Sequence, residues 1–211
     1  RRLLAESMGF EGAFRVSRDY LQLIVQAAAV AFLLPHLGDW LTRHRPGDDP
    51  EKLATTLLIG PVYFVLFLLA GYASRRAKDL TARLGDEDAA ARALWWANLA
   101  TFALLGVGVA TGRFWVAILA FVVLTVLENV WRPVLIARVA DRTEPARQAT
   151  ILSVESQSKA LFAAVVAPLL GLSIDLLRLA TDGERYKFLP LAALGVAISG
   201  GMLLTAKRRS G

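Results

Sequence analysis

Long apolar runs recur along the chain and are separated by short polar segments. A helix needs about 20 apolar residues to cross the hydrocarbon core of a bilayer, which is about 30 Å thick. Six segments reach this length and predict six membrane-spanning helices, at residues 19–41, 53–74, 93–111, 114–137, 150–177 and 188–206. The loops between them are too short to hold a soluble domain. The predicted fold class is therefore an all-α membrane protein, with residues 1–211 forming a single six-helix bundle.

Composition supports a membrane protein. Hydrophobic residues make up 55% of the chain and the mean hydropathy is +0.48, whereas a soluble domain has about 45–50% apolar residues. The absence of cysteine excludes disulfides and thiolate metal sites. The chain begins "RRLLAESMGF", without an initiating Met and without a signal-peptide pattern. We therefore expect that residue 1 is not the natural start and that the chain is a fragment or a trimmed product.

The distribution of basic residues predicts the orientation. Six spans place both termini on one side of the membrane, and Lys and Arg concentrate on the cytoplasmic side. The segments on the terminus side hold roughly twice as many Lys and Arg residues as the opposite loops. Both termini are therefore expected in the cytoplasm, with the protein in the bacterial inner (plasma) membrane. This bias accounts for the net charge of +6 without a nucleic-acid partner.

The fourth span carries a polar stripe made of Thr125, Glu128, Asn129 and Arg132, which lie on one helical face. A charge at the centre of a membrane helix costs roughly 2.5–3.5 kcal/mol, so the stripe should face the bundle interior or a watery cavity. Glu128 and Arg132 have the favoured i,i+4 order. We predict a buried pair that holds this helix against the loop before the fifth span. A static clamp or gate and direct handling of substrate or protons are both open roles.

Other spans repeat the theme. Glu155 and Lys159 are a second i,i+4 pair in the fifth span, and Gln22 and Gln26 lie in the first. Polar groups on several helices predict a shared wet interior, although interhelical hydrogen bonding is the alternative for the amide side chains. The candidates for a substrate or ion path, or for its gate, are Glu128, Arg132, Asn129, Thr125, Gln22, Gln26, Glu155 and Lys159.

The chain lacks the motifs of an enzyme. No HExxH, GxSxG or P-loop pattern is present. The two histidines, His36 and His44, have no partner at metal-binding spacing. No enzymatic activity, metal or cofactor is therefore expected.

Residues 132–157, "RPVLIARVADRTEPARQATILSVESQ", resemble the second half of the major facilitator superfamily. Many members have Arg-Pro at the inner end of the tenth helix and an Arg-Ala-Thr-x-Leu-Ser-like opening of the eleventh. Arg132-Pro133 and the segment from Arg147 to Ser153 are similar to these motifs, with one residue inserted before Ala149. The segment "APLLGLSID" at 167–175 resembles the family's Pro-x-x-Gly-x-x-x-Asp.

Two further segments carry the resemblance. "GYASRRA" at 71–77 is similar to the family's cytoplasmic Gly-x-x-x-Asp-Arg loop, with Arg75 in place of the Asp. The resemblance makes Gly71, Arg75, Arg76 and Arg147 candidates for a conformational loop. "ESMGFEGAFRVSRDYLQ" at 6–22 resembles the amphipathic lead into the seventh helix.

The resemblance implies the carboxyl-terminal six-helix half of a twelve-helix transporter. Such a protein moves a small solute by secondary active transport, with alternating access to a site between two bundles. The implied partners are the lipid bilayer, a small-molecule solute, and an amino-terminal six-helix half or another chain. The alternative is a six-span structural or assembly subunit of a larger membrane complex.

Overall fold

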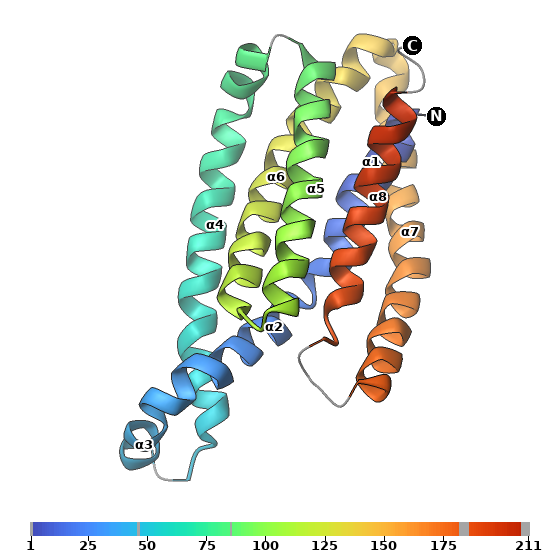
Figure 1. Ribbon diagram of the computed structural model, residues 1–211. Helices are drawn as coiled ribbons and strands as arrows, with labels where there is room; N and C mark the ends of the chain where they lie inside the picture. The colour runs from blue at the N-terminus through green and yellow to red at the C-terminus, as the bar shows by residue number, and fades with distance from the viewer. Residues whose placement is uncertain (1, 46, 85, 182–185, 208–211) are drawn as a thin grey trace.

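The computed structural model describes residues 2–45, 47–84, 86–181 and 186–207. Within these ranges the chain is helical and has no strand. Figure 1 shows the helices packed side by side along one long axis. In chain order they are α1 (Arg2–Arg18), α2 (Leu21–Ala28), the π-helix η1 (Ala29–Leu33), α3 (Leu34–His44), α4 (Pro50–Leu84), α5 (Glu87–Ala110), α6 (Phe114–Arg142), α7 (Pro145–Ala180) and α8 (Leu189–Lys207).

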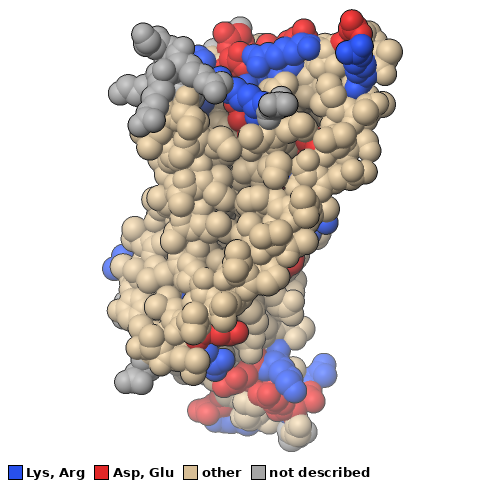
Figure 2. Space-filling view, turned by 90° about the vertical axis from the view of Figure 1, so that its right-hand side faces the viewer, with Lys and Arg blue, Asp and Glu red and all other residues tan. Residues whose placement is uncertain are grey.

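The predicted helical membrane protein is confirmed at this level. Five helical segments are long and apolar enough to cross a bilayer, and a sixth, shorter apolar helix is Leu189–Thr205. Figure 2 shows a broad belt with few charged residues, and most Lys, Arg, Asp and Glu lie at the two ends of the molecule. The five longer segments are Leu21–His44, Pro50–Ala77, Glu87–Ala110, Phe114–Arg142 and Pro145–Ala180.

The first predicted span, residues 19–41, agrees closely with the apolar segment Leu21–His44. Most of the lead-in before it is the helix α1, which packs inside the bundle and buries Phe10 and Phe14. The helix is interrupted between α1 and α2, at Asp19 and Tyr20. Hydropathy does not extend the span into α1, because α1 contains polar side chains such as the buried Glu6. Farther on, α3 and the first turns of α4 extend past the lower ends of α5 and α6 (Figure 1).

The helix that contains the second predicted span is longer than the span. The predicted residues 53–74 agree with the apolar segment Pro50–Ala77, whereas α4 continues to Leu84. Its 35 residues make a helix about 50 Å long, at 1.5 Å per residue. The last turns of α4 are polar because they lie at the charged end of the molecule. The start of α1 and the end of α8 lie at this same end (Figure 1).

An aromatic trio holds α1 against α5 and α6. The Phe10 ring stacks on Trp131, with centroids 4.3 Å apart and an interplanar angle of 9°. The edge of Trp95 meets both rings, at centroid distances of 5.1 Å from Phe10 and 5.8 Å from Trp131. All three side chains are buried. The trio fixes the depth of α1 in the bundle and therefore positions the polar residues one helical turn away.

A second apolar cluster joins α5, α6 and α8. Phe102, Phe121 and Phe188 are fully buried in it. Gly195 of α8 lies directly on the Phe102 ring, since a Cβ there would come within 2.0 Å of the ring carbon Cγ. Small residues of this kind let membrane helices approach closely. The α5–α6–α8 wall is therefore tightly packed and supports α1 from one side.

Candidate functional site

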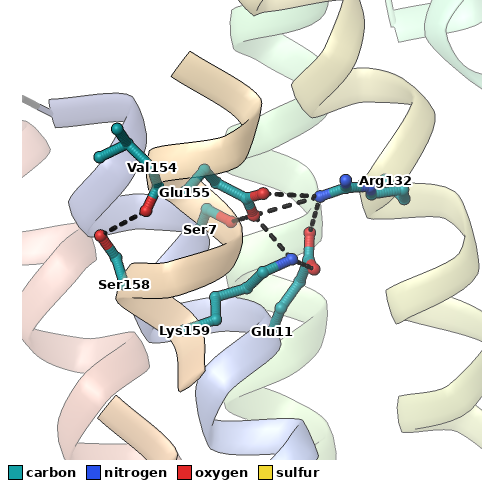
Figure 3. Close-up of polar contacts among 7 residues, drawn as sticks. All are labelled: Ser7, Glu11, Arg132, Val154, Glu155, Ser158 and Lys159. Atoms are coloured by element: carbon teal, nitrogen blue, oxygen red, sulfur yellow. Dashed lines mark hydrogen bonds and ion pairs between the residues drawn. The ribbon is translucent and has the colours of Figure 1, made fainter. Parts of the chain in front are cut away.

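A cluster of four charged side chains joins three helices. Arg132 comes from α6, Glu155 and Lys159 from α7, and Glu11 from α1 (Figure 3). We call these four residues the middle cluster. Arg132 lies ten residues before the end of α6, or about 15 Å along the helix at 1.5 Å per residue. The middle cluster is thus well below the charged end of the molecule.

Each cation in the middle cluster contacts both carboxylates. The Arg132 Nη1 donates to Glu155 Oε1 and Oε2, at 3.1 and 3.0 Å, and lies 3.5 Å from Glu11 Oε1. The Lys159 Nζ lies 2.7 Å from Glu155 Oε1 and also donates to Glu11 Oε2. The Ser7 hydroxyl donates to Glu155 as well. The two positive charges balance the two negative charges.

Burial makes this balance necessary. The side chains of Glu155, Glu11 and Lys159 are 2%, 9% and 11% exposed, and Arg132 is 39% exposed. Removing one partner from a buried ion pair typically costs about 3–5 kcal/mol, because the other charge is left uncompensated. The four residues should therefore act as a unit that ties α1, α6 and α7 together.

Local sequence explains why the residues meet. Ser7 and Glu11 are i,i+4 on α1, and Glu155 and Lys159 are i,i+4 on α7, so each pair lies on one face. Gly12 follows Glu11, and a Cβ at Gly12 would come within 2.6 Å of the Phe162 ring. The glycine lets α1 approach α7 closely enough for the charged side chains to touch.

The predicted Glu155–Lys159 pair is confirmed, but the predicted Glu128–Arg132 pair is wrong. Arg132 reaches across to α7 and α1 instead. Glu128 is half-buried and forms no ion pair within 4.0 Å with any residue that the structure describes. The reason is energetic: an i,i+4 pair on one helix contributes about 0.2–0.5 kcal/mol, whereas two buried carboxylates without cations would cost far more.

The uncharged side chains of the polar stripe on α6 form their hydrogen bonds within their own helix. The buried Thr125 hydroxyl donates to the Phe121 carbonyl at 2.9 Å. The half-buried Asn129 amide donates to the Thr125 carbonyl at 2.8 Å. Asn129 and Arg132 also line a shallow groove of about 460 Å³ beside Ser74 of α4. The partly exposed Arg132 therefore connects the middle cluster with this groove.

Gln22 and Gln26 are not brought to the middle cluster. Both are exposed on α2. Gln26 lines a separate cavity of about 680 Å³, together with Val30 of the π-helix and Glu51 at the start of α4. Most of the lining residues belong to α2, the π-helix, the start of α4 and the α5–α6 connection. These segments lie toward the end of the molecule opposite to that where α1 begins (Figure 1).

The candidates for a conformational loop do not form a loop. Gly71, Arg75 and Arg76 lie inside α4 and are exposed. Arg76 pairs with Asp79 on the same helix at 3.1 Å. Arg147 is in the first turn of α7 and pairs with the exposed Glu144 at 3.5 Å. The charged segment remains helical because its charged side chains form ion pairs with residues one turn away on the same helix.

A second charged cluster, missed by the sequence reasoning, lies nearer the end of the molecule. Arg138 of α6 is 3% exposed and contacts Glu6 of α1 at 2.5 Å and Asp88 of α5 at 2.8 Å. Arg2 pairs with Glu6 at 2.6 Å, and Arg142 pairs with Asp88. We call these five residues the end cluster. Small and apolar residues between the two glutamates of α1 (Ser7, Met8, Gly9 and Phe10) were the available signal, because they indicate a closely packed helix.

The chemistry available at these clusters is ionic. Among the described residues, no group of three or more His, Cys, Asp and Glu could hold a metal ion. The middle cluster can exchange partners, since either cation reaches either carboxylate. Comparison of the chain with protein-family models, with curated proteins and with solved structures finds no significant match.

Proposed function

We propose that the chain is the carboxyl-terminal six-helix bundle of a secondary transporter of the major facilitator type, which moves a small solute by alternating access. The observation that carries this proposal is the middle cluster. It places four charges among three helices of an otherwise apolar bundle, and two of them, Glu11 and Glu155, are buried. Ionisable residues within a membrane are costly and usually serve a function such as a substrate path or a gate.

The contacts of the middle cluster suit a gate between two conformations. Arg132 and Lys159 each have both carboxylates within 4.0 Å, so a small shift of α1 along α7 exchanges partners without stranding a charge. Alternating access needs helices that move against one another while their buried polar groups stay satisfied. A cluster with shared partners meets this need better than one isolated ion pair.

The partners belong to the same proposal. The groove beside Asn129 and Arg132 faces outward from the bundle, and the amino-terminal six-helix half or another chain would cover it to close a path for the solute. The lipid bilayer surrounds the remaining faces. Both termini lie in the cytoplasm, by the bias of Lys and Arg toward their side, and the membrane is the bacterial inner membrane.

Thiol labelling tests whether water reaches this groove. The chain has no cysteine, so a single introduced thiol has no background. We expect a membrane-impermeant, hydrophilic thiol reagent to modify an Asn129→Cys variant of the membrane-embedded protein. The matched control is Leu161→Cys, because Leu161 is 65% exposed on α7 within the apolar belt and should face lipid. If both positions are equally protected, no aqueous path exists.

A structural or assembly subunit is the second candidate. The observation that favours it is the exposure of α7. Within the most apolar 18 residues of this helix, only 11% are buried against the rest of the protein. Large apolar residues such as Leu169, Leu172 and Leu176 remain exposed along it. A subunit that docks on another membrane protein through α7 predicts a protected Asn129 position and a second chain that co-purifies with this one.

A further inference from the structure

A cavity opens between α1, α5 and α8 at the end of the molecule where α1 begins. Its volume is about 520 Å³. Arg2, Arg92 and Arg138 line its charged part, while Trp95, Met202 and Leu203 form its apolar wall. A basic part beside an apolar wall is what a lipid requires, since its headgroup is polar and its acyl chains are not.

The carboxylates in this region are already neutralised. Glu6 accepts from both Arg2 and Arg138, and Asp88 accepts from both Arg138 and Arg142. Arg92 also lines the cavity but forms no ion pair or hydrogen bond with any described residue. Three arginines and two carboxylates therefore line the cavity, which has an excess of positive charge with one guanidinium available for an anion.

The position of Arg92 matches the depth of a headgroup. Arg92 lies in the second turn of α5, just inside the charged end of the molecule. Trp95 follows at i+3 on the same helical face and leads toward the apolar belt. Tryptophan is enriched at the membrane–water interface, and an arginine can donate two parallel hydrogen bonds to a phosphate.

We propose that this cavity binds an anionic phospholipid, with Arg92 and Arg2 holding the headgroup phosphate and Trp95, Met202 and Leu203 contacting the start of an acyl chain. Basic pockets between membrane helices are known to hold anionic headgroups. The cavity is within the range of about 300–1,000 Å³ that is usual for small-ligand sites, so it receives a headgroup rather than a whole lipid. The inference stands apart from the transport proposal because it uses no residue of the middle cluster.

Lipid titration of the detergent-solubilised chain, followed by native mass spectrometry, tests this site. We expect phosphatidylglycerol to bind more tightly than phosphatidylcholine. Arg92→Gln should weaken phosphatidylglycerol binding at least about tenfold, since hydrogen bonds to charged groups contribute about 1.5–3 kcal/mol. Arg83→Gln is the matched control, because Arg83 is exposed on α4 and lies outside this cavity.

Three outcomes would overturn the proposal. Equal affinity for the two lipids would remove the role of charge. Unchanged phosphatidylglycerol binding by Arg92→Gln would place the lipid elsewhere. Competition by glycerol phosphate at the same concentration as the lipid would show a site for soluble phosphates. Folding does not confound the result, because Arg92 has no ion-pair or hydrogen-bond partner among the described residues, and the melting temperature of the lipid-free variant should match that of the parent chain.

Discussion

Glu155 is the residue on which most contacts of the middle cluster converge. It accepts hydrogen bonds from Arg132 and Ser7 and pairs with Lys159 on its own helix. Glu128 lies near this cluster but forms no ion pair there. Two glutamates in adjacent helices therefore offer a direct comparison between a carboxylate that holds helices together and one that does not.

Replacing these two carboxylates should have unequal effects. Glu155→Gln leaves Arg132 and Lys159 with Glu11 alone, so we expect the free energy of unfolding to fall by about 3–5 kcal/mol. Glu128→Gln removes no ion pair and should change it by less than about 1 kcal/mol. Thermal unfolding in detergent measures both. Equal losses would mean that the cluster does not hold α1, α6 and α7 together.

The sequence predicted contacts within one helix better than contacts between helices. Glu155 and Lys159 were identified because a spacing of four residues fixes their proximity on any helix. The predicted partner of Arg132 was wrong, because Glu11 is 121 residues away in the sequence and only the packing of α1 brings it near. Spacing alone cannot indicate which helices are neighbours, so Glu6, Ser7 and Glu11 were not recognised as site residues.

At the scale of the element, α8 depends on one close approach to α5. Gly195 faces the fully buried Phe102 ring, which has no room to move aside. Gly201, on the same helix, has no atom within 4 Å of the position that a Cβ would occupy. The two glycines therefore separate the packing role of a glycine from its effect on helix propensity.

Gly195→Ala and Gly201→Ala should change stability in opposite directions. The first forces a methyl group into the Phe102 ring and should destabilise the protein by about 1–3 kcal/mol. The second adds a methyl group in open space and should stabilise the helix by up to about 1 kcal/mol. Melting temperatures in the same detergent compare them. A neutral Gly195→Ala would show that α8 packs less tightly than described.

The predicted bounds of a helix agree with the structure where the apolar run and the helix begin or end at the same residue. α6 begins at Phe114 as predicted, because its apolar run starts there. The predicted spans leave out α1, because its buried face contains carboxylates, and the end of α4, because most of its last ten residues are polar. Hydropathy indicates which residues can lie in lipid. A helix can continue beyond them into water where helix propensity and ion pairs within the helix stabilise it.

The whole molecule has an apolar belt between two charged ends (Figure 2). The start of α1, the end of α6 and the end of α8 lie together at one end, and the α3–α4 connection lies at the other (Figure 1). We proposed above, from the bias of Lys and Arg, that the first of these ends is cytoplasmic. This assignment fixes which face each introduced thiol should reach.

Labelling at the two ends tests the orientation. Asp48, between α3 and α4, and Asp141, at the end of α6, are both exposed. In intact cells, an impermeant thiol reagent should modify Asp48→Cys, and Asp141→Cys should react only after the membrane is opened. Reaction of Asp141→Cys in sealed cells would reverse the orientation and place the end cluster outside.

The long-range contacts of α1 have a consequence for biosynthesis. Ser7 and Glu11 precede their partners on α7 by 148 residues. At about 5–20 residues per second, ribosomes make that length in roughly 7–30 s. Until α6 and α7 are made, Glu11 has neither Arg132 nor Lys159 as a partner, and placing its carboxylate in lipid would cost several kcal/mol. We therefore expect nascent α1 to wait at the membrane surface and to enter the bundle only when α6 and α7 arrive, so that the late helices complete the insertion of the first.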